Sequence, residues 1–157
     1  MAVRINGIVS SGLGRAHVFM AQKHYQEQFI TIFGESVWPG TLNLTVSDEN
    51  LTKYIALRIK SGIDTLDANK EDMEHAIKIN LDDIVSHRIR GFLRDGVSFG
   101  GATAFKAEFI YQNKTVDCAV LIPDLTRHYD VVEIISPIFL REYYDLKDDC
   151  IVDIILK

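Results

Sequence analysis

Apolar and polar positions alternate along much of this chain, and the alternation predicts a protein built mainly of β-strands. Successive side chains of a strand point to opposite faces, so a strand with one buried face is apolar at every second position. The runs interpreted as strands are residues 3–9, 41–46, 54–60, 131–136 and 150–156. A set of short strands of this kind favours a closed, barrel-like sheet.

A β-hairpin is predicted in the last third of the chain. Residues 105–111 and 116–122 are both strand-like, and the polar segment Gln112-Asn113-Lys114 between them is typical of a turn. Asn113 is expected to take the left-handed conformation there, because asparagine tolerates it better than most residues. Pro123 is expected to end the second strand, since proline has no N–H to donate to a neighbouring strand.

Helical spacing is clear in one segment. Apolar residues at i, i+4, i+7 and i+8, counted from Tyr25, predict a helix over about residues 21–33. Gly34 lies where a glycine commonly ends a helix. A short helical turn is expected over residues 140–145. Between residues 70 and 94 the apolar positions keep no single period, and we expect one or two short helices there.

Length and composition are those of an ordinary soluble protein. The 157 residues are 47% hydrophobic and 25% charged, which suits one domain with a single sizeable core. No apolar stretch is long enough for a signal peptide or a membrane span, so we expect a cytoplasmic protein without a membrane partner. Cys118 and Cys150 lack the CxxC spacing of a zinc site and are expected to be buried, reduced thiols.

The charge balance bears on the class of partner. A net charge of −5 argues against a general nucleic-acid-binding protein, because such proteins usually carry a basic surplus. A local basic cluster, Arg88, Arg90 and Arg94, is either a solvated face or a contact to phosphate.

The segment from Val37 to Leu44 carries the clearest candidate chemistry. Its Pro39-Gly40 pair predicts a tight turn that leads directly into a strand. Thr41 and Asn43 should then share one face of that strand, opposite two leucines that anchor the other face. Two small neutral oxygen donors on one face are able to hold a hard cation or a phosphate, although ordinary hydrogen-bonded strand residues would give the same pattern.

Three further features are candidates for function. Gly12-Leu13-Gly14 can bring the backbone close to a ligand at positive φ, yet His17 stands where the dinucleotide fingerprint requires glycine, and a plain structural turn explains the motif as well. Glu133 lies inside an apolar run, where a carboxylate is paired, exposed at an edge or functional. Arg141 is a lone cation that an ordinary surface ion pair would also explain.

Taken together, these motifs resemble the archaeal CTP-dependent riboflavin kinase family. The matching segments keep the order and nearly the spacing of the family over roughly the first 46 and the last 52 residues. They are Gly7-x-Val9-x-Ser11-Gly12-Leu13-Gly14, Tyr25-x3-Phe29-x2-Ile32-x-Gly34, Gly40-Thr41-Leu42-Asn43-Leu44, Pro123-x2-Thr126-x-His128, Glu133-Ile134-Ile135-Ser136-Pro137-x2-Leu140-Arg141 and Leu146-x-Asp148. The resemblance implies one domain over residues 1–157, with an enlarged insertion around residues 51–100.

The resemblance also implies a fold and an activity. The fold is mainly β, a small cradle-loop β-barrel related to swapped-hairpin transcription factors, with one or a few short helices. The activity is transfer of the γ-phosphoryl group of CTP to the 5′-hydroxyl of riboflavin, which gives FMN and CDP and depends on Mg²⁺. Two alternatives stay open: a non-enzymatic module of the same fold that binds flavin or nucleotide, and a DNA-binding regulator, which the acidic charge disfavours.

Site residues follow from the same resemblance, position by position. Thr41 and Asn43 would bind Mg²⁺, and Thr126 and Glu133 would bind the flavin. Glu133 is also the candidate catalytic residue, able to orient or deprotonate the attacking hydroxyl. The residues that would contact the nucleotide are Gly12, Leu13, Gly14, Arg15, Ala16, His17, Ile138, Phe139, Leu140 and Arg141.

Two segments depart from the family pattern. Arg15 and Ala16 stand where the family usually has Glu-Gly, so a freely positive φ is lost and a cation is gained. Asp148-Asp149-Cys150 stands where the family has Asp-Gly-Asp, so that turn has lost its glycine. Each change is either a neutral variation or the mark of a relative that binds nucleotide without fast turnover.

Overall fold

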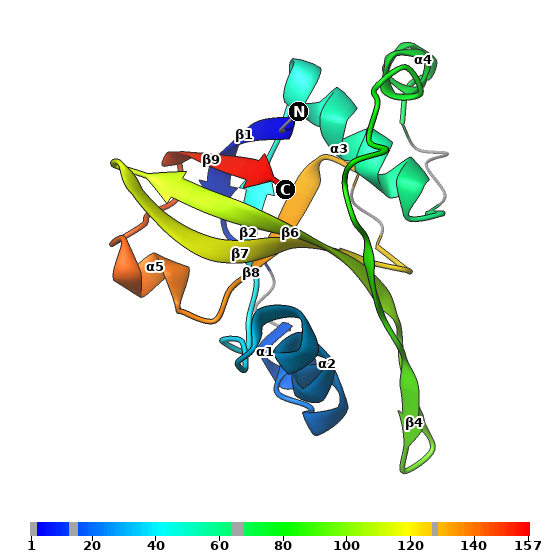
Figure 1. The fold of residues 1–157 in the computed structure, drawn as a ribbon, viewed down its shortest axis with the longest axis vertical. Coiled ribbons are helices and arrows are strands. Elements are labelled where there is room, and N and C mark those ends of the chain that lie inside the picture. The colour runs from blue at the N-terminus through cyan, green and yellow to red at the C-terminus, as the bar shows by residue number, and fades with distance from the viewer. Residues whose placement is uncertain (1–2, 13–15, 64–67, 127–128) are drawn as a thin grey trace.

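A closed antiparallel β-barrel forms the body of the structure, a computed structural model that describes residues 3–12, 16–63, 68–126 and 129–157 (Figure 1). Its strands are β1 (Val3–Ser10), β2 (Leu42–Thr45), β6 (Ala102–Tyr111), β7 (Lys114–Pro123), β8 (Val131–Ile135) and β9 (Ile151–Leu156). They pair in the order β6-β7-β8-β2-β1-β9, and β9 pairs again with β6, which closes the barrel. The predicted mainly β fold is therefore confirmed.

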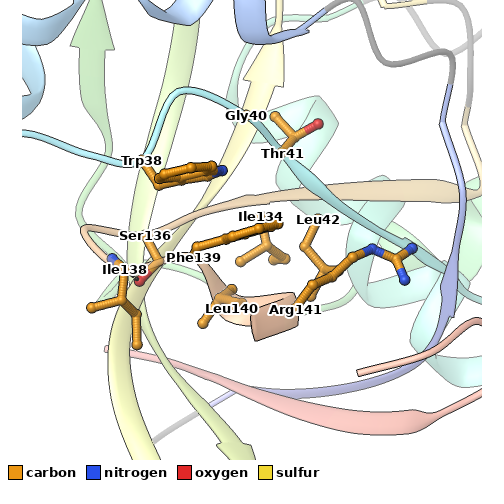
Figure 2. Close-up of a pocket in the computed structure, with 10 residues that line it drawn as sticks. All are labelled: Trp38, Gly40, Thr41, Leu42, Ile134, Ser136, Ile138, Phe139, Leu140 and Arg141. Carbon is orange, nitrogen blue, oxygen red and sulfur yellow. Dashed lines mark hydrogen bonds between the residues drawn. The ribbon is translucent and has the colours of Figure 1, made fainter. Parts of the chain in front are cut away.

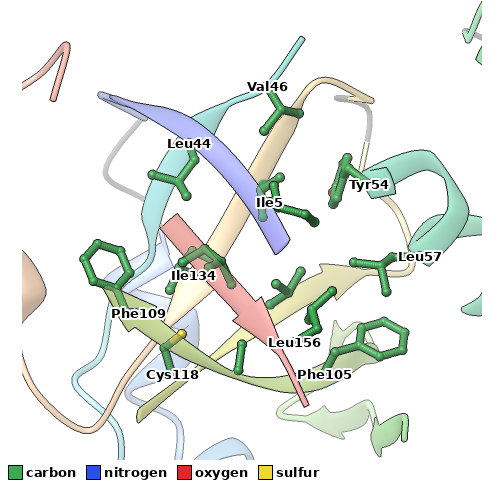
Figure 3. Close-up of a cluster of buried hydrophobic side chains, with 14 of the residues drawn as sticks. Ile5, Leu44, Val46, Tyr54, Leu57, Phe105, Phe109, Cys118, Ile134 and Leu156 are labelled. Atoms are coloured by element: carbon green, nitrogen blue, oxygen red, sulfur yellow. The ribbon is translucent and has the colours of Figure 1, made fainter. Parts of the chain in front are cut away.

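Apolar side chains from alternate strand positions fill the inside of the barrel (Figure 3). Ile5, Leu44, Phe105, Phe109 and Leu156 are each fully buried there. The alternation read from the sequence is the cause, because residues between these positions point outward. Cys118 and Cys150 are both free cysteines; Cys118 is buried in this core as expected, whereas Cys150 is only half-buried.

The long central hairpin is confirmed and extends beyond its prediction. β6 and β7 pair from Ala102 opposite Pro123 to Tyr111 opposite Lys114, so β7 ends at the expected proline. The turn is formed by two residues, Gln112 at φ 51° and Asn113 at φ 63°. Two successive positive φ values are the geometry of the tight turns that suit the right-handed twist of a hairpin.

One end of the barrel is covered by α3 (Asp48–Lys60), with α4 (Lys70–Ala76) packed beside it (Figure 1). The prediction of a strand over residues 54–60 is therefore wrong. Acidic residues in the first turn and basic residues in the last turn of α3 favour a helix through its dipole. All residues from Tyr54 to Arg58 are buried, so the sequence of this short segment shows neither the period of a strand nor that of a helix.

The segment after α4 is only partly as expected. Among the described residues between 70 and 94, α4 is the one helix, as expected, but residues 87–99 form three strands: β3 (His87–Ile89), β4 (Phe92–Arg94) and β5 (Val97–Phe99). β3 pairs with β6, whereas β4 and β5 form a separate hairpin that projects from the body (Figure 1). Its turn is Asp95-Gly96, with φ values of 51° and 78°, and this dipeptide is a strong hairpin signal.

Two helices cover the outer face of the sheet. α2 (Lys23–Phe33) confirms the predicted helix, and Gly34 ends it at φ 79°. α1 (Ala16–Met20) precedes it and was not predicted. A second apolar cluster joins these helices to the sheet, and it includes Tyr25, Phe29 and Leu121.

The chain between β8 and β9 carries the short helix expected over residues 140–145, α5 (Leu140–Tyr143). In the parts of the chain that the structure describes, no helix has the length and apolar character needed to cross a bilayer.

Candidate functional site

A row of outward-facing side chains crosses the barrel where the helices cover it. Strand register places Ser10 opposite Asn43, Asn43 opposite Glu133, and Glu133 opposite Leu121. Directly opposed residues of antiparallel strands point to the same face. The register therefore brings the candidate metal residue Asn43 beside the candidate catalytic residue Glu133, although 90 positions separate them in the sequence.

A cavity of about 720 Å³ lies between this face and the two helices. Thr41, Thr126 and Glu133 supply polar groups to its lining, and apolar residues supply most of the rest, among them Phe19, Met20, Tyr25, Phe29, Ile89, Leu121 and Leu125. Cavities that enclose small organic ligands have this size and this mixture of an apolar wall with a few polar groups. The two residues assigned to the flavin thus line one cavity.

Glu133 occupies the middle of β8, and its side chain faces this cavity. The residues around it are apolar because Val132 and Ile134 pack into the barrel core and Ile135 into the second apolar cluster. Its removal from water raises the pKa of the carboxyl group to about 7. Burial disfavours the charged form of a carboxylate, which is the physical cause of that shift. Near neutral pH the group is therefore shared between its protonated and ionised forms.

Thr41 and Asn43 are brought together as expected. The Thr41 hydroxyl donates a hydrogen bond to Asn43 Oδ1, with 3.2 Å between the oxygens. The intervening Leu42 and the following Leu44 are buried, which fixes the strand that carries the two polar groups. Two adjacent neutral oxygens, with the Glu133 carboxyl on the neighbouring strand, fit Mg²⁺, which prefers oxygen ligands and completes its shell with phosphate and water.

Gly12 packs directly against this pair. A Cβ atom at Gly12 would collide with the side-chain amide nitrogen of Asn43. Glycine is able to adopt a positive φ at this position, but the φ of Gly12 lies outside the left-handed region. Space beside Asn43, rather than backbone conformation, is what requires a glycine here.

Arg141 and Asp148 connect the start of the glycine loop to α5. Arg141 Nη2 donates to the Ser10 carbonyl oxygen at 3.3 Å and to Asp148 Oδ1 at 2.8 Å. Ser11 Oγ donates to the other oxygen of Asp148 at 2.6 Å. These hydrogen bonds from Ser11 and Arg141 lower the pKa of Asp148. Arg141 thus forms the ion pair considered from the sequence, with Asp148 as its partner. This pair lies beside the glycine loop, which the resemblance assigns to the nucleotide.

A smaller cavity of about 50 Å³, whose lining Figure 2 shows, shares Thr41 with the larger one. Its lining includes Thr41, Trp38 and the whole segment Ile138–Arg141. The Trp38 and Phe139 rings stack in parallel, with centroids 4.4 Å apart and 8° between their planes. Thr41 lines both cavities.

The residues that were expected to contact the nucleotide lie partly at the smaller cavity and partly at the larger one. Ile138, Phe139, Leu140 and Arg141 lie at the smaller cavity, whereas Ala16 lies at the larger. Leu13, Gly14, Arg15 and the side chain of His17 lie outside the described residues. Among the residues that the structure describes, no group of three His, Cys, Asp or Glu side chains is placed to hold a metal.

Several residues at the site were not singled out from the sequence. Trp38 belongs to the turn–strand motif, but nothing in the sequence shows that its ring meets Phe139. Tyr25 and Phe29 were correctly expected on the buried face of a helix, and the structure adds that they also line the large cavity. A helical period marks such residues as buried and cannot show which of them border a space for a ligand.

Residues 9–156 match the model of a protein family described as domain of unknown function DUF120 and named for CTP-dependent riboflavin kinases. Similar curated proteins include riboflavin kinases of Thermofilum pendens, 32% identical over 154 residues, Thermoplasma acidophilum, 31% over 146 residues, and Saccharolobus solfataricus, 30% over 148 residues. The alignments cover 97%, 93% and 94% of this chain, and 58%, 54% and 70% of those proteins. The chain thus spans little more than half the length of the first two.

Proposed function

The chain belongs to the CTP-dependent riboflavin kinase family, and we propose that it transfers the γ-phosphoryl group of CTP to the 5′-hydroxyl of riboflavin, giving FMN and CDP. The names of the curated relatives support riboflavin as the acceptor, and the name of the family supports CTP as the donor. Mg²⁺ would be held by Thr41 and Asn43.

One observation carries the proposal: Thr41 lines both the large apolar cavity and the small cavity beside it. Riboflavin would fill the large cavity, where Thr126 and Glu133 supply the polar contacts. The nucleotide would lie across the small cavity, against the segment Ile138–Arg141. The acceptor hydroxyl and the γ-phosphate would then meet at Thr41 and Asn43, which is the positioning that phosphoryl transfer mainly requires.

In the reaction the 5′-oxygen of riboflavin forms a bond to the γ-phosphorus, and the bond from that phosphorus to the β–γ bridging oxygen breaks. The hydroxyl proton passes to the Glu133 carboxylate, and CDP leaves with the bridging oxygen. In the metal-free protein burial raises the pKa of Glu133 to about 7, and a general base works best when its pKa lies near the working pH. When bound, Mg²⁺ neutralises charge on the phosphate oxygens.

Gly12 and Arg141 would shape the nucleotide side of the site. Gly12 lets the loop backbone approach Asn43 closely, since any side chain there would collide with the amide. Arg141 holds the Ser10 carbonyl and Asp148, so it fixes the beginning of the loop relative to α5. Both residues would act by setting the position of the loop that receives phosphate.

The test is a donor panel. Purified protein is incubated with riboflavin, Mg²⁺ and one of CTP, ATP, GTP or UTP, and the flavins are separated by chromatography. FMN that forms with CTP in excess over the other donors is the expected result. A folded protein that binds riboflavin but forms no FMN with any donor would contradict the kinase and favour the non-enzymatic flavin-binding module.

A further inference from the structure

A two-pronged ion pair joins three segments at the rim of the large cavity. Arg88, on β3, directs Nη1 to Asp124 Oδ1 at 2.6 Å and Nη2 to Asp124 Oδ2. Nη1 also lies 3.4 Å from Thr103 Oγ1 on β6. The Asp124 backbone N–H donates to the Gly101 carbonyl at 3.0 Å. We call the Arg88–Asp124 pair, seated over Gly101, the rim latch.

The latch holds the segment that presents the candidate flavin residue. Asp124 directly precedes Leu125 and Thr126, both of which line the cavity. The Thr126 N–H donates to the Pro123 carbonyl at 3.2 Å, so residues 123–126 form one turn. Fixing Asp124 therefore fixes the place from which Thr126 reaches the cavity.

Gly101 lets the latch lie close to the strand. A Cβ atom at Gly101 would collide with the guanidinium of Arg88 and would stand 2.9 Å from both Asp124 Oδ2 and the Ile89 carbonyl oxygen. Gly101 itself lines the cavity, together with Gly100 and Ala102. The latch thus ties the β3–β6 side of the cavity to the turn that faces it.

The fold as a whole gains little from such a pair. The side chains of Arg88 and Asp124 are 53% and 31% exposed, and exposed ion pairs contribute about 0–1 kcal/mol to stability. A guanidinium that meets a carboxylate with two parallel hydrogen bonds does, however, fix direction as well as distance. The main effect of the latch is therefore local.

We propose that Arg88 is a positioning residue for riboflavin, acting through Asp124 to hold the 123–126 turn at the cavity rim. This inference rests on the proposed function insofar as it takes riboflavin to be the ligand of the large cavity. It also gives Arg88, one of the three arginines of the basic cluster, a role other than a contact to phosphate. The Arg88 guanidinium binds a carboxylate of the protein rather than a phosphate of the nucleotide.

The experiment compares Arg88→Met with the control Arg90→Met. Arg90 lies two positions further along the chain. Its hydrogen bonds to other described residues both join its backbone to the side chain of Gln28. Arg88→Met should raise the KM for riboflavin by up to about fivefold, which is the change that corresponds to losing an exposed ion pair. The kcat, the KM for CTP and the melting temperature should stay close to wild type, as should all parameters of Arg90→Met.

Three further variants separate positioning from general damage. Asp124→Asn should reproduce the effect of Arg88→Met, and Arg88→Lys should recover part of the affinity because it keeps the charge. The exchange Arg88→Asp with Asp124→Arg should also bind riboflavin better than Arg88→Met. An unchanged KM for riboflavin in both Arg88→Met and Asp124→Asn would overturn the proposal. An equal rise in the KM for CTP would overturn it too, in favour of a phosphate contact.

Riboflavin binding is also measured without nucleotide, from the quenching of flavin fluorescence. If the wild type binds riboflavin but forms no FMN, the kinase fails, and weaker binding by Arg88→Met still supports the latch. If Arg88→Met binds as tightly as the wild type, the latch fails whatever the fate of the kinase. A wild type that binds no riboflavin would overturn both.

Discussion

Glu133 is the acidic residue in the lining of the large cavity. Its carboxyl group faces a cavity lined mostly by apolar side chains, and burial raises its pKa to about 7. The sequence shows a carboxylate inside an apolar strand, and it leaves open whether that residue is paired, exposed at an edge or functional. The structure places that side chain at the cavity because it faces outward from the barrel beneath covering helices.

The raised pKa of Glu133 predicts how stability changes with pH. Between its ordinary pKa of 4.5 and about 7, the folded state holds a proton that the unfolded state has lost. The free energy of unfolding should therefore fall as pH rises through this range, by at most about 3 kcal/mol from this group. Glu133→Gln should lack this slope, as measured by urea unfolding at several pH values in metal-free buffer. Parallel profiles for the two proteins would contradict the assignment.

Asp149 gives a second prediction for a single residue. It occupies the turn before β9 at φ 77°, and its N–H donates to the Val9 carbonyl at 2.8 Å. A left-handed conformation costs a residue with a Cβ about 1 kcal/mol or more relative to glycine. Asp149→Gly should raise the free energy of unfolding by about 1 kcal/mol, measured by urea unfolding. Asp149→Ala removes the same charge and should not stabilise; equal stabilisation by both would show that charge, not backbone, is responsible.

At the scale of elements, the turn–strand motif and the segment before α5 act as one unit. Trp38 stacks on Phe139, and the backbone N–H of Trp38 donates to the Ser136 carbonyl at 2.9 Å. The turn that leads to Thr41 is thereby held against the segment Ile138–Arg141. Movement of either segment on nucleotide binding should reach the indole ring.

Trp38 is the only tryptophan of the chain, so its fluorescence reports on this unit alone. Adding CTP should change the emission in a saturable way, because the nucleotide would cover the cavity that the ring lines. The Trp38→Phe variant supplies the background. Emission that stays constant at CTP concentrations that support FMN formation would place the nucleotide elsewhere.

Elements differed in how well the sequence predicted them. Strands with one buried face, such as β1 and β2, were predicted because their period of two is plain. α3 was missed over residues 54–60, where a buried apolar run fits either structure. β4 and β5 were missed although Asp95-Gly96 marks their turn, because the strands have only three residues each and show no period.

At the scale of the whole molecule, pairing between strands distant in the sequence assembles the site. Glu133 faces Asn43 because β8 pairs with β2, and Gly12 approaches Asn43 because β2 pairs with β1. Resemblance to a family named these residues, but the sequence alone could not bring them together, since pairing between distant strands has no local signal. The large cavity likewise depends on how α1 and α2 lie on the sheet.

The most direct test of the account follows the phosphate itself. The protein is incubated with riboflavin, Mg²⁺ and CTP labelled at the γ-phosphate, and label is sought in FMN. Wild type should move the label into FMN and release unlabelled CDP. Asn43→Ala should keep its fold, checked by circular dichroism, and lose the transfer. Label that never enters FMN in a folded wild type would contradict the kinase, and transfer at the wild-type rate by Asn43→Ala would remove Asn43 from the site.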